Sequence, residues 1–195
     1  MSIDDVNEFW FGTDEQACRI AMQRWWRKDP VLDAQIAEQF GDLMTRAAAG
    51  DLDNWKQTAT GCLALIVLLD QFPRNVHRDS GQAWAADADA QRVSLHLIET
   101  QMLQQLPIWR RLMAVMPLMH AEDRQLQLVS IAQNEKLVAA APDSWRSTAE
   151  GQLKYAHMHK DIVDRFGRYP HRNERLGRAT TDDEAEFLAG PNSSF

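Results

Sequence analysis

Three segments of this 195-residue chain concentrate side chains that could bind a ligand or move a proton. In the first segment, Asp70 follows a long apolar run and precedes Arg74 and Asn75. We expect Asp70 at the C-terminal end of a buried helix, where the helix dipole and burial both disfavour a carboxylate unless a cation answers it. Arg74 and Arg78 are the nearest cations. The structural alternative is that Asp70 and Arg74 only fasten the helix to the loop that follows.

The second segment, residues 116–123, places His120 between apolar residues and two acids. The start of a helix explains Glu122 and Asp123, because carboxylates are favoured in a first helical turn. It does not explain His120, which we expect to face the interior, either as a core histidine with its hydrogen bonds satisfied or as a proton-transfer group.

The third segment runs from His157 to Asn173. Helical spacing places Tyr155, Met158, Ile162 and Phe166 on one apolar stripe. His159 borders this stripe, whereas His157 points away from it. We therefore expect His159 at the interior.

Arginines crowd the end of the same segment and the residues just after it. Arg165, Arg168, Arg172 and Arg178 occur there together with His171 and Asn173. Such planar donors suit a carboxylate or a phosphate. A solvated basic face is the alternative interpretation.

The composition limits the classes of function. With 21 basic and 28 acidic side chains, the chain has a formal charge of −7, which argues against a general nucleic-acid binder. Two cysteines provide neither a zinc knuckle nor a disulfide scaffold, so we expect a cytoplasmic protein. The acidic start is unlike an export signal, and no apolar run is long enough to cross a membrane.

Residues that typically start and stop helices predict about eight helices and no β-hairpin. We expect a first helix ending near Gly12 and, after it, helices over 14–28, 33–50, 53–72, 82–105, 107–117, 120–140, 144–166 and 182–188. The run 61–69 is apolar all round, which is typical of a helix surrounded by others, although a buried strand is an alternative. The pattern indicates one all-α domain, residues 1–195, of antiparallel helical hairpins.

Several segments resemble signatures of the bacterial domain-of-unknown-function family 924. They are LLDQFPRN at 68–75, MPLMHAED at 116–123, RFGRYPHRN at 165–173 and LGR at 176–178, with further likeness at 9–12 and 181–188. The resemblance covers nearly the whole chain. It implies an all-helical superhelix similar to tetratricopeptide (TPR) repeats, favours His159 as the matching histidine, and implies no particular activity.

The leading hypothesis is a pocket for a small anionic molecule, with metal-independent hydrolysis or other acid–base chemistry and no cofactor. The candidate proton-transfer residues are Asp70, His120, His159 and His171. The candidate ligand-binding residues are Arg74, Asn75, Glu122, Arg165, Arg168, Arg172, Asn173 and Arg178.

Two alternatives stay open. One is a scaffold that binds a peptide or a partner protein, in which the polar motifs are structural ion pairs. The other is a metal hydrolase that uses His120, Glu122, His159 and Asp161, although Asp161 and His159 point in different directions from their helix.

Overall fold

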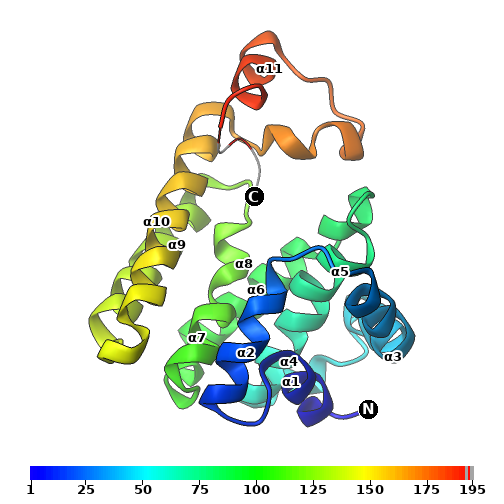
Figure 1. Ribbon diagram of the computed structural model, residues 1–195, viewed down its shortest axis with the longest axis vertical. Helices are drawn as coiled ribbons and strands as arrows, with labels where there is room; N and C mark the ends of the chain where they lie inside the picture. The colour runs from blue at the N-terminus through cyan, green and yellow to red at the C-terminus, as the bar shows by residue number, and fades with distance from the viewer. Residues whose placement is uncertain (192, 194–195) are drawn as a thin grey trace.

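The computed structural model describes residues 1–191 and 193, and over these residues it contains helices and turns and no strand (Figure 1). The α-helices are α1 (Ile3–Phe11), α2 (Glu15–Trp25), α3 (Pro30–Ala48), α4 (Ala59–Ile66), α5 (Phe72–Val76), α6 (Asp87–Glu99), α7 (Ile108–Ala114), α8 (Met116–Met119), α9 (Arg124–Ala140), α10 (Asp143–Phe166) and α11 (Asp182–Leu188). The prediction of an all-α fold is confirmed. None of the described helices is long and apolar enough to span a membrane.

Short helices of other types join these elements. They are the 3-10 helices η1 (Asp53–Gln57), η3 (Gly81–Trp84), η4 (Met102–Gln105), η5 (Pro170–Arg172) and η6 (Glu174–Leu176), and the π-helical turn η2 (Val67–Gln71).

The start of α3 differs from the expected one. We expected this helix to begin at Asp33, but Asp29 is the N-cap, and its carboxylate accepts hydrogen bonds from the backbone N–H groups of Val31 and Leu32. Pro30 therefore begins this helix, because proline has no backbone N–H and the first turn of a helix needs none. Asp33 lies in the first turn and binds Arg78.

The central helix is longer at its C-terminal end than expected. The apolar run is buried and helical, so the strand alternative is wrong. The helix continues beyond Phe72 through α5, although we expected a loop from Pro73. The π-helical turn η2 makes this possible. The Phe72 N–H bonds to the Val67 carbonyl five residues back instead of four, and this shift in the backbone hydrogen-bond register comes directly before Pro73, which has no N–H to donate.

Two other boundaries are also wrong. The helix expected over 82–105 is divided into η3, α6 and η4, with Gln101 in the left-handed region at φ 59°. Asp123 is the N-cap of α9, so Glu122 lies before this helix and not in its first turn.

The helices form two apolar clusters. The main core draws on α1 to α9 and on the start of α10, and it includes the buried run of α4 and η2. The second cluster consists of Ile162, Val163 and Tyr169, with Phe166 and Phe187 packed against them. Figure 1 shows the second cluster's region at the far end of the α9–α10 hairpin, where residues 167–188, here called the C-terminal arm, extend beyond α10.

Candidate functional site

A carboxylate without contact to water lies at the centre of the polar residues. Asp70 has an exposed fraction of 0%, and its Oδ1 is 2.7 Å from His120 Nδ1 and 3.0 Å from Arg74 Nη1. Its other oxygen accepts a hydrogen bond from Gln71. Burial would raise the pKa of this carboxyl, but Arg74 and then His120 hold the pKa well below its usual range. Asp70 lies inside the continuous helix, in η2, and not at the helix end that we expected.

His120 follows α8 and reaches both Asp70 and solvent. Because an ionised carboxylate only accepts hydrogen bonds, Nδ1 of His120 carries the hydrogen, and Nε2 of the neutral ring is an acceptor. Burial and then the charge of Arg74 lower the pKa of His120, against the opposing effect of Asp70. The side chain is 14% exposed, so a neutral, basic imidazole stays within reach of a small molecule.

Asp87 links this pair to the C-terminal arm. It is the first residue of α6 and accepts two hydrogen bonds from Arg74, at 2.8 and 3.0 Å. Arg172 of the arm also donates to Asp87, at 3.1 Å, and to the backbone carbonyl of His120, at 3.1 Å. These contacts form a closed ring that runs through Asp70, Arg74, Asp87, Arg172 and His120.

Aromatic side chains border the ring of contacts. The Arg172 guanidinium lies 5.2 Å from the ring centre of Trp84 and 4.6 Å from that of Tyr169. The His171 ring lies 6.3 Å from Trp84 and 5.6 Å from Tyr169. Among the described residues, Nε of Arg172 and Nδ1 of His171 have no hydrogen-bond partner. These two atoms are the unsatisfied polar groups of the site.

His159 lies behind His120, with 6.2 Å between the ring centres. Its side chain is buried, and Nδ1 donates to the backbone carbonyl of Tyr155 at 2.8 Å. Burial, and then repulsion from His120 when that ring is protonated, lower the pKa of His159 to about 3. Burial and the neighbouring Arg172 lower the pKa of His171 to about 4. His157 is exposed, as we expected. Tyr155 is also exposed, so the prediction that it belongs to the apolar stripe is wrong.

The other predicted ligand-binding residues fasten the C-terminal arm. Arg178 makes two hydrogen bonds to Glu122, at 2.5 and 2.9 Å, and Arg168 makes two to Glu184, at 2.6 and 2.8 Å. Arg165 pairs with Asp183 on the surface.

The two predicted asparagines also hold neighbouring chain segments. Asn173 bonds to Glu184 and Arg178, and Asn75 bonds to Arg78 and to the backbone of Gln71. The structure therefore gathers Asp70, Arg74, His120, His159, His171 and Arg172, and it places Arg165, Arg168, Arg178, Asn173 and Asn75 outside this group.

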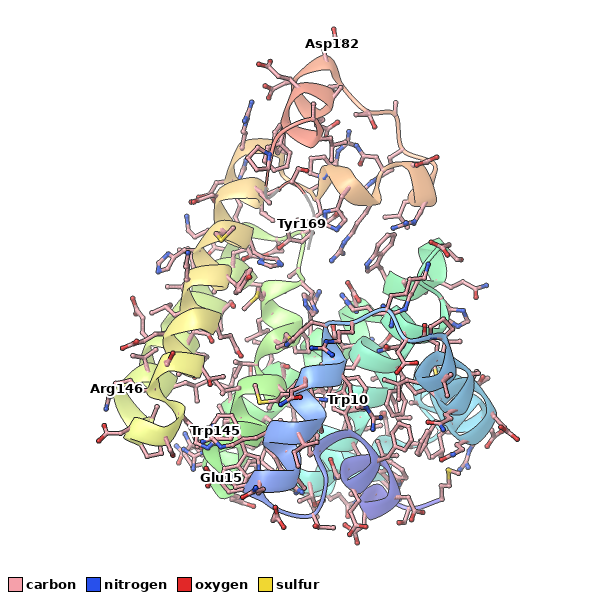
Figure 2. The ribbon with its side chains drawn as sticks, in the orientation of Figure 1. Trp10, Glu15, Trp145, Arg146, Tyr169 and Asp182 are labelled. Atoms are coloured by element: carbon pink, nitrogen blue, oxygen red, sulfur yellow. The ribbon has the colours of Figure 1, made fainter. Side chains whose placement is uncertain are left out.

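Tyr169 anchors the arm to the site. Its hydroxyl donates to the Met119 carbonyl at 2.6 Å and accepts from Gln127 at 2.8 Å, and its backbone N–H donates to Glu122. Figure 2 shows Tyr169 where α10 meets the arm, while Asp182 marks the arm's far tip. These contacts hold His171 and Arg172 beside α8.

Metal-ligating residues do not gather in the described part of the chain. No three His, Cys, Asp or Glu side chains among residues 1–191 and 193 are placed to hold a metal ion. Glu122 is bound to Arg178, and Asp161 is exposed. The four residues of the metal hypothesis are therefore not a ready set of ligands.

Sequence analysis did not identify Asp87 and Trp84 as site residues. An acid near the start of a helix is normally explained by the helix dipole, and scattered tryptophans are normally core residues. Only the fold shows that both lie beside Arg172.

Over the described residues, the fold and the site together define an all-helical protein with a polar centre built from five segments of the chain. A family model described as "Bacterial protein of unknown function (DUF924)" matches residues 6–192, so the chain belongs to this family. The solved structure titled "Structure of Protein of Unknown Function ATU0120 from Agrobacterium tumefaciens" is similar, with 33% identity and a TM-score of 0.82 over 95% of this chain and 96% of that one. No curated protein matches the chain.

Proposed function

We propose that this protein is an acid–base enzyme, most simply a metal-independent hydrolase, that acts on a small anionic molecule. The observation that carries the proposal is the 2.7 Å contact between His120 Nδ1 and the buried Asp70, on a histidine that is still partly exposed. A carboxylate in this position fixes the tautomer and stabilises the imidazolium that forms when Nε2 takes a proton.

The reaction follows from this tautomer. Nε2 of His120 removes a proton from a water molecule, the water oxygen bonds to the electrophilic carbon or phosphorus, and the imidazolium returns the proton to the leaving group. Asp70 stays ionised throughout. His171 is the second candidate for proton transfer, because its Nδ1 has no partner among the described residues.

The anionic part of the substrate is assigned to two arginines. Arg74 has a side chain 21% exposed, and the buried Arg172 has an Nε without a hydrogen-bond partner among the described residues. Both guanidinium groups form an ion pair with Asp87, so at this carboxylate two positive charges face one negative charge. An anion would restore the balance of charge once His120 takes a proton.

A matched pair of variants tests the proposal. H120Q removes the proposed base, and H157Q removes an exposed histidine of α10. The probes are para-nitrophenyl phosphate, pyrophosphate and N-acetyl amino acids. We expect turnover of one probe that survives in H157Q and falls by about 10²–10⁴-fold in H120Q. Turnover that H120Q retains, or none with any probe, would contradict the proposal.

A TPR-like scaffold that binds a peptide or protein is the second candidate. It is favoured by one observation, namely that Arg74, Arg165, Arg168, Arg172 and Arg178 each pair with a carboxylate. In this case R172A would unfold the protein without changing any ligand response. In the enzyme, R172K would keep the fold and weaken the binding of a phosphate probe.

A cytoplasmic location without nucleic acid or membrane partners agrees with either function. Cys18 and Cys62 are free and buried, and burial raises the pKa of each thiol to about 11. Both thiols therefore stay protonated and are suited to a reducing compartment. We also propose that residues 1–195 act as one domain.

A further inference from the structure

We propose that the end of α2 and the start of α3 form a docking surface for an acidic segment of a partner protein. The surface consists of Ile20, Arg24, Trp26, Arg27, Lys28 and Val31, here called the basic–apolar patch. None of its side chains forms a hydrogen bond or an ion pair with the described residues of the ring around His120, and it carries an interaction that the proposed chemistry does not use.

The patch exposes apolar side chains that a helical protein normally buries. Trp26 is 65% exposed, Val31 is 69% exposed and Ile20 is 60% exposed. These are three of the seven exposed large hydrophobic residues of the described chain, and all three fall within residues 20–31. Trp is enriched at the centre of protein interfaces, where its large ring supplies much of the binding energy.

The charge of the patch is opposite to that of the whole chain. Residues 20–31 contain three cations and one carboxylate, whereas the chain has a net charge of −7. The carboxylate, Asp29, is engaged in capping α3. Within residues 1–191 and 193, no acidic side chain forms an ion pair with Arg24, Arg27 or Lys28. Their charges are available to a partner that carries carboxylates.

The backbone beneath the patch is anchored to its neighbours. Trp25 beside it is buried, donates from its indole N–H to the Trp10 carbonyl and stacks on the Trp10 ring. Arg78 binds Asp33 at 2.8 Å and also reaches the Arg27 carbonyl. Because this backbone is already ordered, the conformational entropy lost when a partner binds is limited to the side chains.

A hollow borders the patch and fits a protein partner better than a membrane. It has a volume of about 400 Å³, and its lining includes Lys28, Pro30 and Arg78 together with two carboxylates, Asp33 and Asp79, which pair with Arg78 and Arg175. It can take an anchoring side chain, which a flat lipid surface does not supply. Charges are screened over about 8 Å at physiological salt, so a peptide senses the local cations, whereas a wide anionic membrane also meets the acidic remainder of the chain.

The probe is a synthetic helical peptide with leucines on one face and glutamates on the other, titrated into ¹⁵N-labelled protein. We expect chemical-shift changes centred on residues 20–31 that weaken with added salt. R27E/K28E should weaken binding by about tenfold or more, and W26S should weaken it with little change in melting temperature. Two controls, K154E and L128S, alter exposed residues of α10 and α9 and should bind like the wild type.

Three results would overturn the proposal. They are the absence of shifts at residues 20–31, binding that R27E/K28E and W26S leave unchanged, and binding to phosphatidylglycerol vesicles in place of the peptide. H120Q should bind the peptide normally, so the failure of the enzyme proposal and the failure of the docking surface can be told apart.

Discussion

Arg172, in the C-terminal arm, donates to Asp87 at the start of α6 across 85 positions of sequence. The same carboxylate accepts two hydrogen bonds from Arg74, which in turn touches Asp70. Asp87 therefore joins the arm, the central helix and the histidine site, and it is the residue on which their relative positions depend.

Replacement of Asp87 tests this role. D87N should lower the free energy of unfolding by about 3–5 kcal/mol, because it leaves the buried Arg172 guanidinium without its carboxylate. Urea unfolding followed by circular dichroism gives the value.

The matched control is D79N. Asp79 lies 3.6 Å from Arg175 with a side chain 81% exposed, so its loss should change stability by less than about 0.5 kcal/mol. Equal effects of D87N and D79N would show that Asp87 does not hold the three parts together.

The buried His159 predicts a dependence of stability on pH. A histidine in the unfolded chain titrates near pH 6.5, whereas the folded pKa of His159 is about 3. Between these values the unfolded chain binds the extra proton, so stability falls as the pH drops, by about 1.4 kcal/mol per pH unit for this histidine. Above pH 6.5 this contribution is fully present.

The measurement is urea unfolding at pH 7, 6 and 5 for the wild type, H159N and H157N. The slope between pH 6 and pH 5 should be shallower in H159N than in the wild type. H157N is the control, since it removes an exposed histidine from the same helix. A slope in H159N as steep as that of the wild type would refute the assignment.

Two glycines test how closely the arm approaches η3. A Cβ at Gly81 would lie 2.8 Å from the Arg175 carbonyl, so G81A should push the arm away and cost about 1–3 kcal/mol. Gly151, in α10, has open space at the same position. G151A should stabilise the protein by about 0.5–1 kcal/mol, because alanine favours a helix interior. A neutral G81A would mean that the arm is not pressed against η3.

The apolar pattern predicted much of the fold. Periodicity and capping residues placed α1, α10 and α11 well, and the uniformly apolar run indicated the buried helix at the centre. The boundaries around Pro30 and Pro73 were wrong for one reason. A proline can end a helix, lie in the first turn of the next one, as Pro30 does, or follow a π-helical turn within a helix, as Pro73 does, and only the hydrogen bonds of its neighbours decide which.

The site was predictable only in part. Local signals pointed to Asp70, His120 and His159, because a carboxylate or imidazole within an apolar segment needs a partner. The same reasoning gave no means of separating Arg172, which lies at the site, from Arg168, which fastens α11. The difference is the position of Asp87 and Glu184, and that position depends on long-range contacts.

The tautomer of His120 is the most direct test of the proposed acid–base site. A long-range ¹H–¹⁵N spectrum of the imidazole rings at pH 7, with His120 assigned by the signal missing from H120Q, reports which nitrogen carries the hydrogen. We predict a neutral ring with the hydrogen on Nδ1, facing Asp70, and a bare Nε2. A hydrogen on Nε2, or an imidazolium at pH 7, would contradict the role of His120 as a base held by Asp70.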